Sequence, residues 1–520
     1  MPADLLPLLS PVALLVAALV IATTDPGPRA RRARRRVELA ALVALGVAVF
    51  SALQMVFDGP WTAQLALSDH VGLKIRFDSI AAVMLGLVAF VGWVVLRFAA
   101  TYLDGEPRQG AFLAWMSATI GAVLVLVIAG DLILLALAWV AIGLSLHRLL
   151  LFYPDRVQAR RAARKKALTA RLGDLALIGA VLALAEAYGT TDIGAILAAA
   201  RAGEAPPAAL WAAGLLALAA LFKSAQVPSH AWLTEVMETP TPVSALLHAG
   251  VINAGGFLLI RFADVMLLAP GVLAALVLVG GFTALLGGLA MLAQPAVKTS
   301  LAWSTIAQMG FMILQCGLAL FPIALLHIVA HSLYKAHAFL SSGMAVELVT
   351  ANRRPGPVAV PNGRAVLRAF ALALGIYIVI IFALGMVGKS PQAIALGAIL
   401  IFGVAYLLAQ GLADNAPREL TRRTGLWALA ASLSYVALQE IAERVTADAL
   451  PPVPSPGGLE WALLVLTVAS FGAVALAQAI FPHWAGHPAA AGLRVHLANG
   501  LYLGALTDRF LGTWSVERKG

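Results

Sequence analysis

Five ionisable side chains stand inside stretches that are otherwise almost entirely apolar. Lys223 ends the run ALWAAGLLALAALF, and His248 lies within the next apolar stretch. His327, His331 and Lys335 recur every four residues in HIVAHSLYKAH, so they share one face of a helix. A lysine at the centre of a membrane helix costs about 2.5–3.5 kcal/mol on insertion scales. Each of these five groups is therefore a candidate for function.

Two interpretations of Lys223 remain open. The lysine can snorkel from a helix end, so that its ammonium reaches the membrane interface. Alternatively, Pro228 breaks the helix and the lysine faces a water-filled cavity, where burial lowers the cost of releasing its proton.

His248 is either a hydrogen-bonded structural residue or a proton relay, since histidine titrates near neutral pH. Pro240 and Pro242 precede it and remove backbone donors, which predicts a broken helix here. Asn253 adds a second polar group to the same stretch.

The stripe of His327, His331 and Lys335 predicts a hydrated path, with a structural role as the alternative. Its HxxxH spacing also occurs in metal sites, but the next residue on that face is a lysine and no carboxylate follows. We expect neither a metal nor a catalytic site in this chain.

Four acidic residues are possible counter-charges for the buried lysine. Glu235 and Glu238 lie in the short polar segment HAWLTEVMETP, where solvation of a loop is the alternative role. Asp174 and Glu186 lie in or beside an apolar stretch and are candidates for a buried carboxylate.

The composition of the whole chain explains where these groups must sit. Of 520 residues, 61% are hydrophobic and 12% charged, and the mean hydropathy is +0.90. Because a soluble domain carries about 25% charged residues, this is a polytopic membrane protein. The fold class is all-α, with about 15 transmembrane helices, some of them discontinuous. The expected spans are 5–24, 37–57, 78–98, 110–129, 131–152, 172–189, 208–226, 240–263, 266–293, 299–320, 322–349, 366–387, 391–413, 424–445 and 459–481.

Basic residues predict the orientation in the membrane. The cluster PGPRARRARRR and the 155–171 loop are expected in the cytoplasm, which places the N-terminus outside and the C-terminus inside. The net charge of +10 then reflects topology and anionic lipid, and not nucleic-acid binding. The predicted parts are N-terminal helices (1–75), a core (76–350), C-terminal helices (351–481) and a cytoplasmic tail (482–520).

The segment KSAQVPSHAWLTEVMETPTPVSALLHAG resembles the signature of a known family. These are the antiporter-like, proton-conducting membrane subunits of respiratory complex I and of multisubunit cation/proton antiporters, which have an inverted-repeat fold. The resemblance implies that Lys223 and His248 lie on a proton path, continued by HSLYKAHAFL. It also implies a glutamate after a tryptophan in the fifth span, but Val140 follows Trp139 here.

Three further segments are similar to one branch, the membrane subunits (DabB) of two-component inorganic-carbon complexes. They are NAGGFLLIR directly after the signature, LSLHRLLLFYPDR in the fifth span, and GLRVHLANGLYLGALTDRFLG near the end of the chain. That resemblance implies a transporter subunit of a bacterial inner membrane, using protons or sodium. It implies a large peripheral, zinc-containing, carbonic-anhydrase-like partner on the cytoplasmic face, with no cofactor in this chain. Two alternatives remain: a subunit of complex I or of a cation antiporter, and a non-conducting membrane anchor for a soluble partner.

Overall fold

The computed structural model describes residues 3–28, 30–66, 72–342, 361–383, 388–413 and 416–511. Within these ranges, 13 helices are long and apolar enough to cross a membrane. Two further apolar helices lie among them: α8 (Pro207–Lys223) is shorter, and α14 (Val297–Gly317) carries more polar residues. Each of the 15 predicted spans coincides with at least one helix, so the all-α membrane fold is confirmed.

The first part of the chain forms two long helices and a small hairpin. Its elements are η1 (Ala3–Leu8), α1 (Leu9–Thr24), α2 (Arg31–Asp58), β1 (Trp61–Ala66) and β2 (Gly72–Phe77). The antiparallel hairpin, which the sequence did not predict, pairs Trp61 with Phe77, and their rings stack at 4.7 Å.

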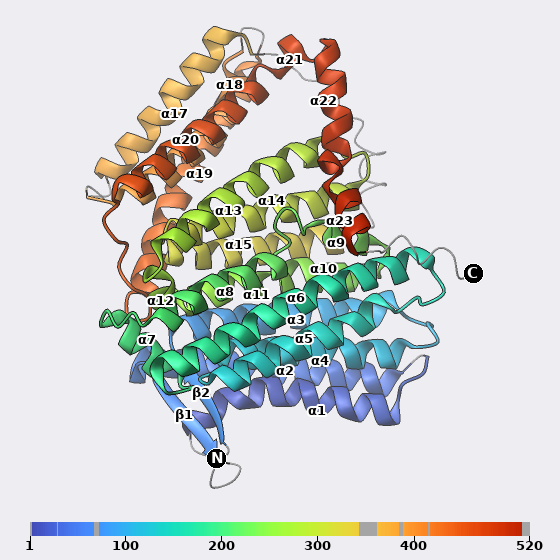
Figure 1. Cartoon of the computed structure of the whole chain (residues 1–520). Coiled ribbons are helices and arrows are strands. Elements are labelled where there is room, and N and C mark those ends of the chain that lie inside the picture. The colour runs from blue at the N-terminus through green and yellow to red at the C-terminus, as the bar shows by residue number, and fades with distance from the viewer. Residues whose placement is uncertain are drawn as a thin grey trace.

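The core follows as a layered set of helices (Figure 1). It contains α3 (Ser79–Tyr102), α4 (Gln109–Ile128), α5 (Leu132–Leu150), α6 (Val157–Tyr188), α7 (Ile193–Arg201), α8, α9 (Ala231–Glu235), η2 (Val236–Glu238), α10 (Thr241–Ala249), η3 (Val251–Asn253), α11 (Ala254–Arg261), α12 (Ala263–Leu267), α13 (Pro270–Leu292), α14 and α15 (Phe321–Leu340).

A C-terminal group completes the molecule. It consists of α17 (Gly363–Ala383), α18 (Pro391–Gly411), α19 (Arg418–Val445), α20 (Gly458–Ala479), α21 (Phe481–Trp484), α22 (Pro488–Ala498), η5 (Gly500–Tyr502) and α23 (Leu503–Leu511). The predicted tail at 482–520 is therefore helical over much of its described length.

One prediction about the core is wrong. The segment 155–171 is not a loop, because α6 begins at Val157 and continues unbroken to Tyr188. Lys165 and Lys166 are consequently buried against neighbouring helices and do not lie in solvent.

Glycines allow α13 and α14 to pack closely. A Cβ at Gly280 would lie 2.5 Å from the Leu314 backbone nitrogen, and one at Gly287 would lie 2.7 Å from the Ala307 nitrogen. Close backbone approach of this kind is typical of small residues in membrane helix pairs.

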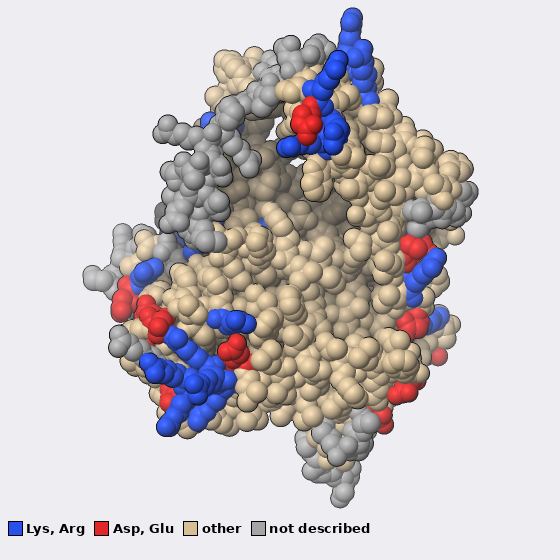
Figure 2. Space-filling view, turned by 180° about the vertical axis from the view of Figure 1, so that it is seen from behind, with Lys and Arg blue, Asp and Glu red and all other residues tan. Residues whose placement is uncertain are grey.

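The two ends of the helices are distinct. The hairpin, α7, α12 and the loop before α20 gather at one end, and α9, α23 and the start of α6 at the other (Figure 1). Figure 2 shows that charged side chains gather toward the edges of the molecule, while the broad face between them carries few.

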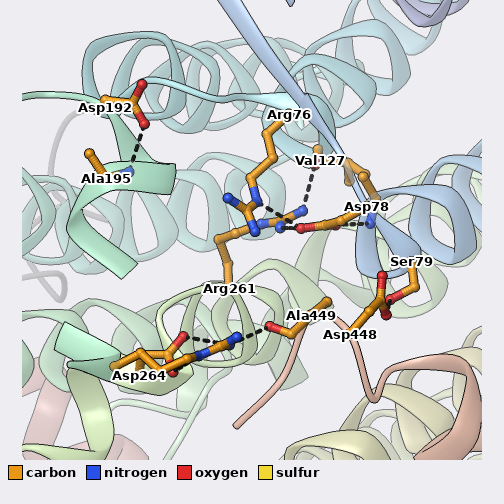
Figure 3. Close-up of polar contacts among 12 residues, drawn as sticks. Arg76, Asp78, Ser79, Val127, Asp192, Ala195, Arg261, Asp264, Asp448 and Ala449 are labelled. Atoms are coloured by element: carbon orange, nitrogen blue, oxygen red, sulfur yellow. Dashed lines mark hydrogen bonds and ion pairs between the residues drawn. The ribbon is translucent and has the colours of Figure 1, made fainter. Parts of the chain in front are cut away.

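Buried ion pairs join the elements at the first of these ends (Figure 3). Asp78 accepts hydrogen bonds from Arg261 at 2.5 Å and Arg76 at 2.8 Å, and it caps α3 through the Ala81 nitrogen. Burial alone would raise the pKa of Asp78, but the two guanidinium groups outweigh it and lower the pKa to about 2.

A second pair extends this contact to the C-terminal group. Arg201 binds Asp264 through two hydrogen bonds of 2.8 and 3.1 Å and also donates to the Ala449 carbonyl. Together the pairs hold the C-terminal end of α11, through Arg261, and the adjoining α12, through Asp264.

Candidate ion path

His248 lies at the end of a short helix inside the predicted span 240–263. Pro240 and Pro242 occupy the N-cap and first turn of α10, so they begin this helix. The interruption within the span comes later, at Gly250, where α10 gives way to η3 and α11. Carbonyls in the last turn of a helix have no intrahelical partner and can accept hydrogen bonds from elsewhere.

The imidazole of His248 is fully buried and held on two sides. Its Nδ1 lies 2.9 Å from the Thr305 hydroxyl of α14, and its ring stacks on Phe339 with centroids 4.3 Å apart. The other nitrogen, Nε2, is buried without a hydrogen-bond partner among the described residues. This nitrogen is therefore not committed to a hydrogen bond within the described structure.

His331 reaches the same interruption from α15. Its Nε2 lies 3.2 Å from the His248 carbonyl, so the bond uses an acceptor that the helix break releases. Its Nδ1, like His248 Nε2, has no partner within the described part of the chain. The two imidazoles thus belong to one buried cluster.

Lys335 and His327 extend this cluster along α15. His327 and His331 have ring centroids 6.0 Å apart, and His327 Nδ1 lies 3.0 Å from the Gln315 amide oxygen. Lys335 is buried and donates to the Leu301 carbonyl at 3.0 Å. The predicted stripe therefore faces the protein interior and not lipid.

Lys223 lies on the opposite side of the break. Its ammonium sits 4.2 Å from the centre of the Trp139 ring of α5, a cation–π contact. The next residue, Ser224, donates to the Ile252 carbonyl at 3.0 Å, which ties the end of α8 to η3. A side chain at Gly255 would collide with Ser224, so glycine permits this contact. Pro228 follows the end of α8 by five residues and does not itself end it.

Asp174 is the carboxylate whose charge acts on Lys223. It is buried on α6, and its charge also acts on Lys166 of the same helix. Lys166 donates to the Gly143 carbonyl at 2.8 Å and interacts electrostatically with Lys223. The charge of one acid therefore acts on the half-buried Lys223 and the buried Lys166, while Arg171 forms the ion pair with it at 3.2 Å.

Protein-family models match most of this region. The description "NADH:quinone oxidoreductase/Mrp antiporter, TM" covers residues 129–354, and "NADH-Ubiquinone oxidoreductase (complex I), chain 5 N-terminus" covers 65–113. A protein named "Probable inorganic carbon transporter subunit DabB2" from Halothiobacillus neapolitanus is 37% identical over 99% of this chain and 94% of its own length. The chain belongs to the antiporter-like membrane subunit family.

Other relatives of this antiporter-like subunit match over shorter lengths. "Probable inorganic carbon transporter subunit DabB" of Hydrogenovibrio crunogenus is 44% identical over 59% of this chain and 58% of its own length. NADH-quinone oxidoreductase subunit L of Escherichia coli is 34% identical over 60% of this chain, which spans about half of that protein, 52%.

Solved structures share the fold. The Mrp complex from Dietzia sp. matches with a TM-score of 0.64 at 22% identity, over 98% of this chain and 61% of that one. Respiratory complex I from Thermus thermophilus matches with a TM-score of 0.57 at 21% identity, over 98% of this chain and 99% of that one. At these identities the likeness concerns the fold alone.

Two of the other predicted counter-charges lie away from Lys223. Glu235 of α9 pairs with Lys165, and Glu186 is exposed near the far end of α6. The side chain of Glu238 lies outside the described part of the structure. Of the three predicted acids whose side chains are described, Asp174 is the one whose charge acts on Lys223.

Three charged residues of the antiporter-like subunit were missed. Lys165 and Lys166 were assigned to a loop, and Asp508 to the tail, yet all three are buried. The apolar positions that continue from 159 into the 172–189 span could have revealed a longer helix. No sequence pattern links Arg161 to Asp508, which lie 347 residues apart and 3.0 Å from each other.

The arrangement suits proton movement better than bond-making chemistry. Imidazole, ammonium and hydroxyl groups with exchangeable protons lie around one helix break, and two of the imidazole nitrogens have no protein partner among the described residues. In the described residues, no three His, Cys, Asp or Glu side chains converge as metal ligands would.

Proposed function

We propose that this chain is the ion-conducting membrane subunit of an inorganic-carbon uptake complex. Protons, or sodium ions, move through it and drive a cytoplasmic, carbonic-anhydrase-like zinc protein that traps carbon dioxide as bicarbonate. The proposal is supported by the names of the DabB relatives, one of which matches this chain almost end to end. The zinc chemistry belongs to the partner.

The observation that carries the ion-conducting role is the shared helix break. His331 binds the His248 carbonyl, and Ser224, adjacent to Lys223, binds the Ile252 carbonyl four residues further on. Groups on α8 and α15 therefore meet the same short interruption from different sides. A change in protonation on one side can alter the backbone contacts of the other.

The proposed route runs from His327 and His331 with Lys335 to His248, and then to Lys223. The Asp174 carboxylate stabilises the ammonium form of Lys223. It thereby acts as the counter-charge that other members of the family have in a glutamate at the position of Val140. Because Asp174 interacts with Lys166 as well, a proton leaving Lys223 has a second buried amine beside its counter-charge.

The chain is placed in the bacterial inner membrane with its N-terminus outside and its C-terminus in the cytoplasm. The basic cluster at 29–36 and the basic start of α6 then face the cytoplasm. In this orientation α9, α23 and the Lys223 end of α8 also lie on the cytoplasmic side, where a soluble partner can reach them (Figure 1).

The test is rescue of a carbonic-anhydrase-deficient bacterium in ordinary air. This chain should restore growth only when expressed with its carbonic-anhydrase-like partner. Replacing Lys223 or His248 by Ala should abolish uptake of labelled bicarbonate while the complex still assembles. Unchanged uptake in both variants would refute the ion path.

The same strain separates the alternative roles. A subunit of complex I or of an antiporter should give sodium- or quinone-dependent proton movement and no rescue. A non-conducting anchor should support carbon uptake that an uncoupler leaves unchanged.

A further inference from the structure

The last described helix, α23, is amphipathic in the opposite sense from that expected of a surface helix. Its polar residues Thr507 and Asp508 face the protein, and Asp508 is almost fully buried. Its outward face carries Leu506, which is 53% exposed, and the exposed Arg509. These two lie three residues apart and therefore on one side of the helix. Tyr502, which is 44% exposed, ends η5 immediately before α23.

Ion pairs fix which side faces inward. Asp508 binds Arg161 at 3.0 Å and Lys165 at 2.5 Å, both on α6. Lys165 is fully buried and also pairs with Glu235 of α9. Removing one partner from a buried ion pair costs about 3–5 kcal/mol, so rotating α23 to hide Leu506 would be strongly unfavourable.

Close contacts reinforce this orientation. The Thr507 hydroxyl donates to the Pro228 carbonyl at 3.3 Å, and a Cβ at Gly504 would lie 3.2 Å from the Ala231 side chain. The inner side of α23 is thus shaped to lie on α9, and its apolar side is left on the surface.

The position of α23 shows what can cover that surface. The helix rests on α6 and α9, at the same end of the molecule as the C-terminus of the described chain (Figure 1). This is the end of the molecule that the proposed orientation places in the cytoplasm, where a soluble protein can reach the outward face of α23. Arg160 and Arg164, both exposed on the adjoining part of α6, add positive charge beside Arg509.

We propose that the outward face of α23 is the docking surface of a soluble protein partner. The partner presents an apolar pocket for Leu506 and Tyr502, bordered by Asp and Glu side chains that complement Arg509, Arg160 and Arg164. The inference rests on the proposed function, which supplies a partner on this side of the membrane.

The contacts also connect this surface to the ion path. Lys165, which holds Asp508 and Glu235, is followed in the chain by Lys166, which interacts with Lys223. A change of charge near Lys223 is therefore one residue away from the ion pairs that seat α23.

The test uses the full chain, tagged and co-expressed with the carbonic-anhydrase-like protein. Leu506→Glu should lower the amount of partner that co-purifies by at least tenfold. The matched control is Leu493→Glu, which changes an exposed leucine on α22 and should leave the amount unchanged. Equal retention in the two variants would overturn the proposal.

A second measurement guards against misfolding. A photo-crosslinking residue at position 506 of the otherwise unaltered chain should form an adduct with the partner. Adducts confined to lipid or to a second copy of this chain would overturn the docking surface. If the unaltered chain retains no partner at all, the proposed partnership fails and the surface with it. If the Leu506→Glu variant still retains the partner, the docking surface is refuted but the proposed partnership is not.

Discussion

Replacing Asp174 by Asn should stop ion movement through Lys223 without preventing assembly. In the wild-type chain the charge of one buried carboxylate acts on the half-buried Lys223 and on the buried Lys166. The neutral amide of asparagine no longer favours the charged form of Lys223. Each 1.36 kcal/mol of electrostatic stabilisation that is lost lowers the protonation constant of Lys223 tenfold. Lys223 would then rarely carry the proton that the path needs.

The assay is uptake of labelled bicarbonate by carbonic-anhydrase-deficient cells that express the chain and its partner. In the Asp174→Asn variant the uptake rate should fall to background. In the Asp174→Glu variant part of the uptake rate should remain, because this substitution keeps the negative charge. Glu186→Gln is the matched control, since Glu186 is an exposed acid on the same helix. If Asp174→Asn transports as well as Glu186→Gln, the counter-charge of Lys223 lies elsewhere.

Three further perturbations test the site and its supports. Gly280→Ala should lower the Tm of the purified protein in detergent, by the equivalent of about 1–3 kcal/mol, because its Cβ meets the facing helix; Gly288→Ala, with nothing within 4 Å, should not. His248→Gln should retain a hydrogen-bonding side chain but lose at least tenfold in uptake, and full activity would leave this histidine a structural role. Asp78 has a pKa lowered from 3.8 to about 2, so its ion pairs stabilise the fold above pH 4 and lose their effect as pH falls toward 2. That difference is worth about 2 kcal/mol, and Asp78→Asn should lower the Tm at pH 7 while weakening its dependence on acid pH.

The spans could be predicted because each is a long apolar run, and length and hydropathy alone decide whether a segment can cross a bilayer. The stripe of His327, His331 and Lys335 was equally accessible, since a period of four residues places side chains on one helix face. The start of α6 was not. Dense arginine and lysine suggested a solvated loop, yet the chain there is helical and buries Lys165 and Lys166.

Contacts between distant segments were beyond the sequence for a different reason. The interruption at Gly250 depends on Ser224 and His331 binding carbonyls of η3 and α10, and neither bond follows from local propensity. The same holds for Asp508, whose partners lie on a helix more than 300 residues earlier in the chain. The importance of such residues can be recognised from their burial and their partners, and both are known only once the fold is known.

The absence of a glutamate at Val140 means that the counter-charge of Lys223 is on a different helix, at Asp174 of α6. An acid on α5 would face Lys223 from the helix that now offers it the Trp139 ring. With the acid on α6 instead, the counter-charge of the path shares a helix with Lys166 and Lys165, and Lys165 holds the ion pairs of α9 and α23. Arg171 also pairs with Asp174, but its side chain is 57% exposed, so it competes weakly for that carboxylate. With its counter-charge on α6, Lys223 is linked to the helix against which the ion pairs of Lys165 and Arg161 hold α23, the element of the proposed docking surface. In the proposed function the partner performs the chemistry, so this helix is where a change in protonation must act.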